Sequence, residues 1–477
     1  VTVEQDSHAG NDFNLDVPPL PSMVTVGTGL DYGKTLDKHG AADLSAIWEQ
    51  SGLAAAMPPS LQRLTARDGK QFYVPAAFGW EAIYYNKQIF AQYNLQPPQN
   101  WEEFLAVNDA LRSHGETPLV IAAEGDSRGY WFQYLVLRLY GAQVYHDLLN
   151  GHIPFNDPRI RNVMEKWQAL FERGDLKALA QGNDQDMMMT LVRGDTDKAA
   201  AASGSTRAVM ALTDGHVASQ LTPDLLAELG FFRFPIMDPS LPVTEATYSY
   251  GYAAPTGQPL SPATEALLNF AGSAAGQAII AHAHNDWTSG RADIAAREDA
   301  AQQEAAELLQ QADAAVQDFY GLMPGQMISM FDDTLTGFIN APQEIDGPLN
   351  ELETARQIML DKGAFADSTI ESSASPTQTA STLVGQLLLA GPDDASSPVS
   401  DALVFQVDAA DPAVAGTFPG HQEVDGIDHV DFDLFGPDGQ QLYHHLERWA
   451  PYCGFDDGDP CNIYNFAEHN YQWPKGQ

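Results

Sequence analysis

The hydrophobic pattern of this chain changes at a polar stretch, residues 366–400, and this change most limits what the chain can fold into. The stretch is rich in Ser, Thr, Ala, Pro and Gly around one short apolar piece, residues 383–390. Such a composition buries little apolar area and is typical of a flexible linker. The 477 residues also exceed what one hydrophobic core usually supports. We therefore expect a large domain over 1–365, a linker over 366–400 and a small domain over 401–477.

Helical and strand patterns alternate in the large domain. Apolar residues recur at helical spacing over 102–113, and a short apolar strand follows at 118–122. A second helix is expected over 157–174, because Asp157 and Pro158 suit a first helical turn. Further segments complete the pattern: strands at 23–29, 231–235 and 244–255, and helices at 262–281 and 298–317. This alternation predicts a layered α/β domain.

In the small domain the hydrophobic pattern has a different period. Residues 403–407, 430–435 and 441–446 are predicted strands separated by Gly-, Asp- and Pro-containing turns. This spacing favours a β-sandwich. Residues 447–458 resemble a phrase found in β-sandwich modules of secreted bacterial proteins, where a final strand follows. Since the chain ends at Gln477, we expect a truncated module.

The charge balance excludes two classes of partner. Asp and Glu total 64 against 24 Lys and Arg, a formal net charge of −40. Nucleic acids and anionic membranes need clustered cations, so neither is an expected partner. Dispersed acidic charge suits a saline, halophilic exterior, although a mildly acidic secreted protein is the alternative. No apolar run reaches the roughly 20 residues of a membrane span.

Two cysteines, Cys453 and Cys461, lie close together in a Gly-, Asp- and Pro-rich loop. Their short spacing suits a local disulfide and hence an oxidising compartment. The alternative is a zinc site that also uses His444, His445 or His469.

Catalytic, cofactor and metal motifs are missing from the sequence. It contains no G-x-S-x-G, H-E-x-x-H, P-loop or G-x-G-x-x-G pattern. We predict no enzyme activity, no cofactor and no metal site. Two carboxylate-rich loops, 182–186 and 456–459, leave calcium binding open as an alternative, although neither has the full spacing of an EF-hand.

Several short sequence segments occur in the same order as in one known protein family. Residues 69–75 read GKQFYVP, residues 84–90 read YYNKQIF, and residues 94–104 read NLQPPQNWEEF. Residues 248–255, YSYGYAAP, and 266–277, ALLNFAGSAAGQ, follow later. Together they resemble the sugar-type extracellular solute-binding proteins of ATP-binding-cassette (ABC) importers, over about residues 20–320.

The resemblance implies a two-lobed α/β fold of the periplasmic-binding-protein type. Lobe one would comprise residues 1–122 and 250–365, and lobe two residues 123–249. The family's first strands and helix are not recognisable in residues 1–22. We therefore expect a first lobe that is either incomplete or degenerate.

The resemblance also implies a function. It predicts a monomeric extracytoplasmic receptor, periplasmic, cell-surface or secreted, that delivers a mono- or oligosaccharide to an ABC permease. No signal sequence is visible, and the chain opens on Val1. Two alternatives stay open: a secreted polysaccharide-active enzyme with a binding module, and a cell-surface sensory or adhesion protein.

Candidate ligand-binding residues follow from the resemblance, because such receptors close aromatic faces and polar groups over a sugar. Trp80 and Glu81 would lie at the pocket edge, although a core Trp beside a surface Glu is an equal alternative. Ser205 belongs to a segment, 200–206, that is similar to the family's cleft turn. The remaining candidates are aromatic, and packing in the core is the alternative for each: Tyr130, Trp131, Tyr248, Tyr250 and Trp287.

Overall fold

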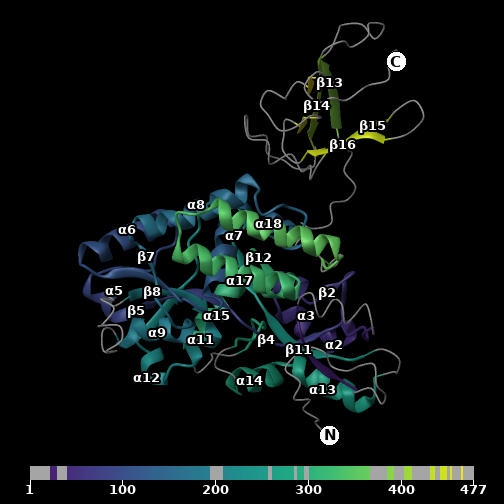
Figure 1. The fold of residues 1–477 in the computed structure, drawn as a ribbon. Helices are drawn as coiled ribbons and strands as arrows, with labels where there is room; N and C mark the ends of the chain where they lie inside the picture. Colours follow the sequence, from purple (N-terminus) through teal and green to yellow (C-terminus); the bar gives the residue numbers. More distant parts are fainter. Residues whose placement is uncertain are drawn as a thin grey trace. The chain divides into compact units, whose positions relative to one another are not determined.

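The computed structural model divides the chain into two compact units, with the boundary between Ser373 and Ala374 (Figure 1). In the larger unit it describes residues 22–28, 40–193, 208–255, 260–283, 287–294 and 300–365. In the smaller unit it describes residues 384–390, 402–410, 430–435, 441–447, 452–453 and 464–465.

Two sheets organise the larger unit. A five-stranded sheet has the order β7-β6-β8-β5-β9, with β6 parallel to β7 and β8, and β5 antiparallel to β8 and β9. A three-stranded antiparallel sheet has the order β1-β11-β4. The strands are β1 (Val24–Gly27), β4 (Val74–Phe78), β5 (Glu81–Asn86), β6 (Thr117–Ile121), β7 (Leu176–Ala178), β8 (Ala208–Asp214), β9 (Leu229–Phe232) and β11 (Ser249–Ala253).

The chain passes between the two sheets at two neighbouring places. One passage joins β4 to β5 through Gly79 and Trp80, and the other joins β10 (Thr244–Thr247) to β11 through Tyr248. A third element, the parallel pair of β10 with β12 (Ala314–Gln317), lies beside these passages. The two sheets are thus the centres of two lobes.

The lobe boundaries differ from those expected. Residues 81–122 were assigned to the first lobe, but β5 and β6 belong to the five-stranded sheet together with β8 and β9. The reason is that β5 pairs with β8 along Glu81–Tyr85 and with β9 along Ile83–Asn86, so the lobe changes at Gly79 rather than near residue 122.

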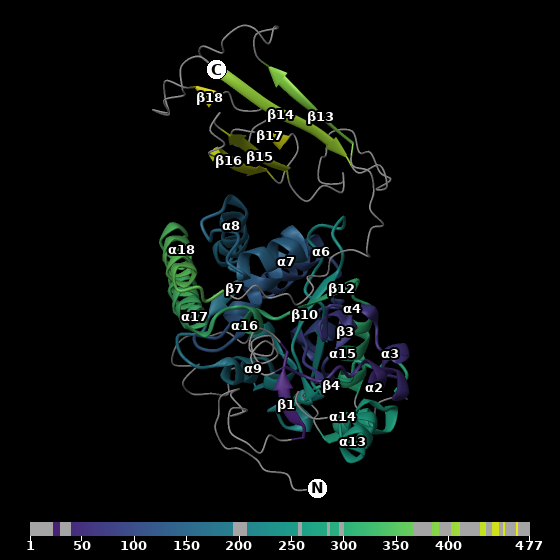
Figure 2. The same ribbon diagram turned by 90° about the vertical axis from the view of Figure 1, so that its right-hand side faces the viewer.

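Helices cover the five-stranded sheet, and the C-terminal helices of the unit pack with them (Figure 2). Ring contacts join the two groups. The ring centroids of Phe331 and Phe132 lie 5.1 Å apart, and so do those of Phe338 and Trp167. These contacts place residues 319–359 with the second lobe, although the sequence assigned them to the first. The helices of this lobe are α5 (Lys87–Gln92), α6 (Trp101–Ser113), α7 (Ser127–Leu149), α8 (Pro158–Glu172), α9 (Asp184–Arg193), α11 (Gly215–Ser219), α12 (Pro223–Leu226), α16 (Phe319–Leu322), α17 (Gly325–Asn340) and α18 (Asp346–Asp361).

Shorter helices accompany the three-stranded sheet, together with the small hairpin of β2 (Ala66–Arg67) and β3 (Lys70–Gln71). The predicted helix over 298–317 ends earlier than expected, because Ala314–Gln317 leaves it to pair with β10 as strand β12. The helices are α2 (Ser45–Gln50), α3 (Leu53–Ala56), α4 (Pro59–Arg63), α13 (Pro262–Gly272), α14 (Ala274–Ala283) and α15 (Ala300–Gln310).

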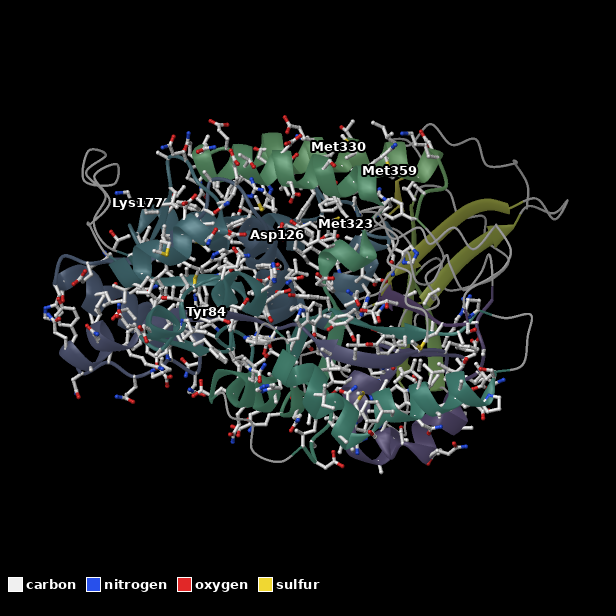
Figure 3. All side chains as sticks on the ribbon, turned by 90° about the horizontal axis from the view of Figure 1, so that it is seen from below. Tyr84, Asp126, Lys177, Met323, Met330 and Met359 are labelled. Atoms are coloured by element: carbon white, nitrogen blue, oxygen red, sulfur yellow. The ribbon has the colours of Figure 1, made fainter. Side chains whose placement is uncertain are left out.

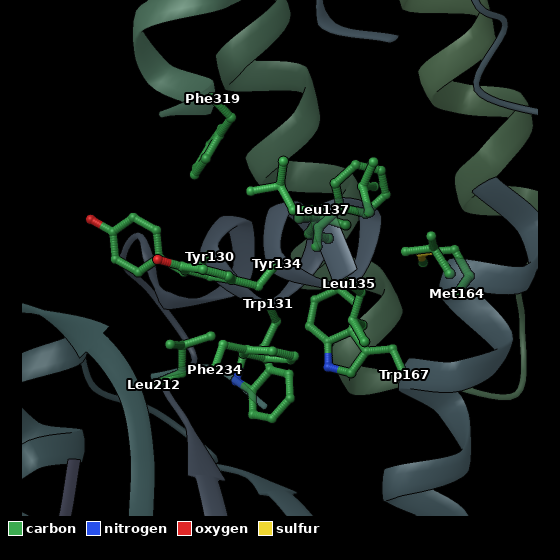
Figure 4. Packing of buried hydrophobic residues seen from close by; sticks show 14 of the residues in the cluster. Tyr130, Trp131, Tyr134, Leu135, Leu137, Met164, Trp167, Leu212, Phe234 and Phe319 are labelled. Carbon is green, nitrogen blue, oxygen red and sulfur yellow. The ribbon is translucent and has the colours of Figure 1, made fainter. Parts of the chain in front are cut away.

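The largest core cluster surrounds α7, whose residues 127–138 are all buried. Figure 4 shows aromatic rings in this core, with Trp131 beside Phe234. Tyr134 stacks on the same Phe234 ring, with centroids 5.2 Å apart. Because α7 packs on both its sheet and the C-terminal helices, it holds the second lobe together.

The smaller unit contains strands in the three ranges that the sequence predicted. Strand β14 (Ala402–Ala410) pairs with β13 (Val384–Ala390), β17 (Tyr452–Cys453) and β18 (Tyr464–Asn465). Strands β15 (Val430–Phe435) and β16 (Gln441–Glu447) form a second pair. The apolar piece assigned to the linker is therefore strand β13, paired with β14 over its whole length. The β-sandwich stays a prediction, and so does the disulfide, since Cys461 lies outside the described residues.

A buried ionic cluster ties α7 to β10. Glu245 is fully buried and accepts from Arg138, at 2.9 Å, and from Arg233, at 2.6 Å. Arg138 also donates to the backbone oxygens of Phe234 and Thr244, and Tyr134 donates its hydroxyl to Glu245 at 3.0 Å. These contacts position β10, and through it the second passage between the lobes.

We predict that Glu245→Gln lowers the free energy of unfolding by about 3 kcal/mol or more, because it leaves the buried Arg138 without its counter-charge. Urea denaturation followed by circular dichroism measures the change. Glu351→Gln, which removes an exposed charge on α18, is the control and should change the free energy by less than about 0.5 kcal/mol. Equal stability of the two variants would contradict the structural role of the cluster.

Candidate ligand-binding cavity

A cavity of about 560 Å³ lies where the passages between the lobes meet the ends of several elements. Its walls come from the start of α7, the β8–α11 junction, the β10–β11 passage, the segment around residue 287 and the β12–α16 junction. Nine residues line it: Asp126, Tyr130, Asp214, His216, Tyr248, Tyr250, Trp287, Asp318 and Tyr320. Three carboxylates and five aromatic rings therefore surround one space.

Three of the rings form an aromatic wall, which we define as Tyr248, Tyr250 and Trp287. Trp287 meets both tyrosines edge to face, with centroids 4.8 Å from Tyr248 and 4.5 Å from Tyr250. Gly79 makes room for this wall, because a Cβ at that position would lie 2.2 Å from the Tyr248 ring. The first passage between the lobes thus needs glycine where it touches the second.

Asp214 is held by the start of a helix and by a tyrosine. It is the N-cap of α11, where its Oδ1 accepts from the backbone N–H of Val217 at 2.8 Å. Its Oδ2 accepts from the Tyr130 hydroxyl at 3.0 Å. Burial raises the pKa of Asp214, while these hydrogen bonds act in the opposite direction. The carboxyl is therefore fixed in position beside the cavity.

Asp126 lies at the start of α7, at the cavity, and is labelled in Figure 3. It accepts a short hydrogen bond from the Tyr320 hydroxyl, which joins α7 to α16. Its backbone N–H donates to Oδ2 of Asp184 at 2.7 Å. Burial raises the pKa of this Asp184 carboxyl to about 6. The first turn of α7 is thus fixed from two sides.

Asp318, like Asp214, is a buried carboxyl. It caps α16, and its Oδ1 accepts from the backbone N–H of Gly321 at 3.1 Å and from the Gln317 amide at 2.7 Å. Burial, with smaller contributions from the charges of Asp126 and Asp214, raises its pKa to about 7. Asp318 therefore changes charge near neutral pH.

Glu81 lies next to this group without lining the cavity. It is fully buried, and the Gln133 amide donates to its Oε2. Burial, followed by the charges of Asp318, Asp214 and Glu245, raises its pKa well above the usual value for Glu. The negative charge around the cavity is therefore concentrated enough for the carboxyls to disfavour one another's ionisation.

The structure brings four of the predicted binding residues to the cavity: Tyr130, Tyr248, Tyr250 and Trp287. Glu81, Trp80 and Trp131 are buried and do not line it. Trp131 meets Phe234 edge to face, because this side of α7 packs on the five-stranded sheet. Ser205 lies outside the described residues.

Trp80 has a positioning role instead. Its backbone oxygen accepts from the N–H of Gly215 at 3.0 Å, and its indole N–H donates to the Tyr84 hydroxyl at 3.1 Å. A Cβ at position 215 would lie 2.6 Å from the Trp80 ring. Trp80 thus fixes the turn that carries Asp214 and His216 to the cavity.

Sequence reasoning missed five lining residues: Asp126, Asp214, His216, Asp318 and Tyr320. A signal existed for two of them. Asp214 and Asp318 each follow a short apolar segment and cap the helix that comes next. Asp318 was hidden because residues 298–317 were predicted as one helix, so the β12–α16 junction was not recognised.

No metal centre is evident in the described part of the chain, where His, Cys, Asp and Glu form no group of three or more that could hold an ion. In the carboxylate-rich loop 182–186, Asp186 and Asn183 cap each other's backbone N–H groups at 3.1 Å. Among the described helices, none combines the length and the apolar character that a membrane crossing requires.

The sequence matches a known family over most of the larger unit. The model of the family described as bacterial extracellular solute-binding protein matches residues 31–278, more than half of the chain. The chain therefore belongs to the bacterial extracellular solute-binding proteins. The family predicted from the sequence is confirmed.

A curated relative and two solved structures are similar to it. An ABC transporter extracellular-binding protein of Pyrococcus horikoshii is 26% identical over 153 residues, 30% of this chain and 34% of that protein. The bacterial solute receptor AcbH, described as preferring β-D-galactopyranose, has a TM-score of 0.61 at 19% identity over 71% of this chain and 84% of its own. A chitin oligosaccharide binding protein has a TM-score of 0.55 at 18% identity over 72% and 85%.

These similarities confirm the predicted two-lobed α/β fold. The sequence match to the curated relative is shorter, since the chain spans about a third of that protein's length.

The raised pKa of Asp318 predicts how stability depends on pH. Because the folded pKa of about 7 exceeds the unfolded value of about 4, folding binds a proton. This contribution to stability is fully present below about pH 4 and is lost as the pH rises through about 7. Asp318→Asn should therefore reduce the pH dependence of the unfolding free energy by an amount on the order of 2–4 kcal/mol between these limits.

Melting curves of the ligand-free protein from about pH 5 to about pH 8 measure this effect. Asp361→Asn, at an exposed position of α18, is the matched control. If both variants keep the pH dependence of the parent protein, Asp318 is not the titrating group.

Proposed function

We propose that this protein captures a carbohydrate outside the cytoplasm and delivers it, chemically unchanged, to an ABC permease. The observation that carries the proposal is that the aromatic wall and the carboxyls of Asp126, Asp214 and Asp318 line one cavity. Aromatic rings stack on the C–H faces of sugars, and carboxylates accept hydrogen bonds from hydroxyl groups. The cavity thus offers both kinds of contact that a sugar ring needs.

The size of the cavity supports a small ligand. A volume of about 560 Å³ lies within the range of about 300–1,000 Å³ that small-molecule sites occupy. This space suits a mono- or short oligosaccharide. Two of the similar structures are described as receptors for a galactopyranose and for chitin oligosaccharides, which supports the same class of ligand.

The two-lobed fold supports capture by closure. The cavity lies where both passages connect the lobes, so a hinge motion there would change its width. The permease, a monomeric state and an extracytoplasmic location are parts of the proposal that the family membership supports. The absence of catalysis is also part of the proposal, because a receptor releases its ligand intact.

We predict that Tyr250→Ala weakens binding of the cognate sugar about tenfold, equivalent to about 1.4 kcal/mol, because it removes one face of the aromatic wall. The cognate sugar is first found by a thermal-shift screen of mono- and oligosaccharides, and calorimetry then gives the affinity. Recovery of the sugar after incubation checks that it is unchanged.

Tyr252→Ala is the matched control, since Tyr252 lies on the same strand, is half-buried and does not line the cavity. This control should lose stability without losing affinity. Cleavage of the sugar would favour a hydrolase, and equal affinity of both variants would place the binding site elsewhere.

We also predict that Gly79→Ala weakens sugar binding about tenfold or more, because the added Cβ would force the Tyr248 ring out of its place. Gly347→Ala, in α18, tests whether loss of a glycine alone has this effect, since a Cβ there meets no atom within 4 Å and the backbone is not in the left-handed region. Calorimetry with the same sugar compares the two variants. An unchanged affinity in Gly79→Ala would mean that Tyr248 takes no part in binding.

A further inference from the structure

We propose that the ligand of this cavity carries a positive charge, as in an amino sugar, and that its ammonium group binds among Asp126, Asp214 and Asp318. This inference rests on the proposed function and specifies the class of carbohydrate. Three observations carry it: the balance of charge in the lining, an unused oxygen on Asp318, and the aromatic wall.

Acidic side chains dominate the charge of the cavity lining. Three of the nine lining residues are carboxylates, and none of the nine is Lys or Arg. Arg128 follows Asp126 closely in the sequence, but its guanidinium donates to the backbone oxygens of Ala123 and Gly125 and to the Thr336 hydroxyl. Among the described residues that line the cavity, His216 is therefore the one side chain that can carry a positive charge beside the three carboxylates.

The second oxygen of Asp318, Oδ2, can accept a hydrogen bond from a ligand. Only 6% of this residue is exposed, and it lines the cavity. Both hydrogen bonds from the Gln317 amide and the Gly321 N–H go to Oδ1. No described residue donates to Oδ2. This oxygen is therefore open to a donor from a ligand, and an ammonium group offers three donors.

A charged donor fits this site better than a neutral hydroxyl. Asp126 and Asp214 already accept from the hydroxyls of Tyr320 and Tyr130, so neutral donors are present and the negative charge remains. Opposite charge close to a carboxylate favours its ionised form, whereas a hydroxyl leaves the mutual repulsion of the carboxylates in place. Hydrogen bonds that involve an ionised group are also about twice as strong as neutral ones.

The aromatic wall contributes in the same direction. Trp287 and the two tyrosines present π-electron faces and edges around one side of the cavity. Such faces attract cations as well as the C–H groups of a sugar ring. An amino sugar would use both properties, with its ring against the wall and its ammonium group toward the carboxylates.

The experiment compares matched sugars on the full chain by calorimetry at about pH 7, where amino sugars are largely protonated. Glucosamine and galactosamine are each titrated beside the parent sugar and the N-acetyl derivative, which keeps the nitrogen but removes its charge. We expect each charged sugar that binds to do so at least about tenfold more tightly than its two neutral counterparts. Methylammonium, which keeps the three N–H donors, serves as a cation without a sugar ring.

Two variants test the residues. Asp318→Asn and Asp126→Asn each remove one negative charge with little change of shape, and each should lower the ratio of charged to neutral affinity about tenfold. Asp361→Asn, remote and exposed on α18, should keep the ratio of the parent protein. Melting curves show whether each variant folds, and if Asp318→Asn does not, the ratio in Asp126→Asn decides.

The outcomes separate this inference from the proposed function. Equal or tighter binding of the neutral sugars would overturn the inference and leave carbohydrate capture standing. Binding of methylammonium with none of the sugars would support cation recognition and overturn the carbohydrate proposal. A preference for amino sugars that survives in both variants would overturn the assignment to these carboxylates, and no binding of any probe would overturn both proposals.

Discussion

The two passages of the chain between the lobes are hydrogen-bonded to each other, and the cavity depends on this contact. Gly79 donates its backbone N–H to the backbone oxygen of Tyr248 at 2.8 Å, and the Thr247 hydroxyl donates to the backbone oxygen of Gly79 at 2.7 Å. Phe78 and Thr288 form a bridge on the same side, which brings Trp287 to the wall. Because these bonds are short and mostly buried, the aromatic wall keeps its place relative to both sheets.

Around this frame the protein holds several carboxyls close together by several means. Helix N-termini stabilise Asp214 and Asp318, tyrosine hydroxyls donate to Asp126 and Asp214, and two arginines neutralise Glu245. For Glu81 and Asp318, burial raises the pKa instead. The electrostatics of the cavity are thus a compromise between ionised groups that are hydrogen-bonded and groups whose charge depends on pH.

Much of the fold could be predicted because local pattern and tertiary structure agree there. The helix over 102–113 is α6, capped by Asn100, and the helix after Asp157 is α8, with Asp157 as its cap. Prediction failed where the same residues suit two states. Ala314–Gln317 continues an Ala- and Gln-rich helical pattern, yet it forms β12, because pairing with β10 in the buried interior outweighs local preference.

The sequence by itself determined the family, the alternation of helices and strands in the large unit and the strands of the small one, since these follow from residue order and hydrophobic period. It also indicated four of the aromatic residues at the cavity. Only the tertiary structure decided that Trp80 and Trp131 belong to the core and that Asp126, Asp214 and Asp318 share one cavity. The reason is physical: which face of an element meets solvent, core or cavity depends on packing partners that lie far away along the chain.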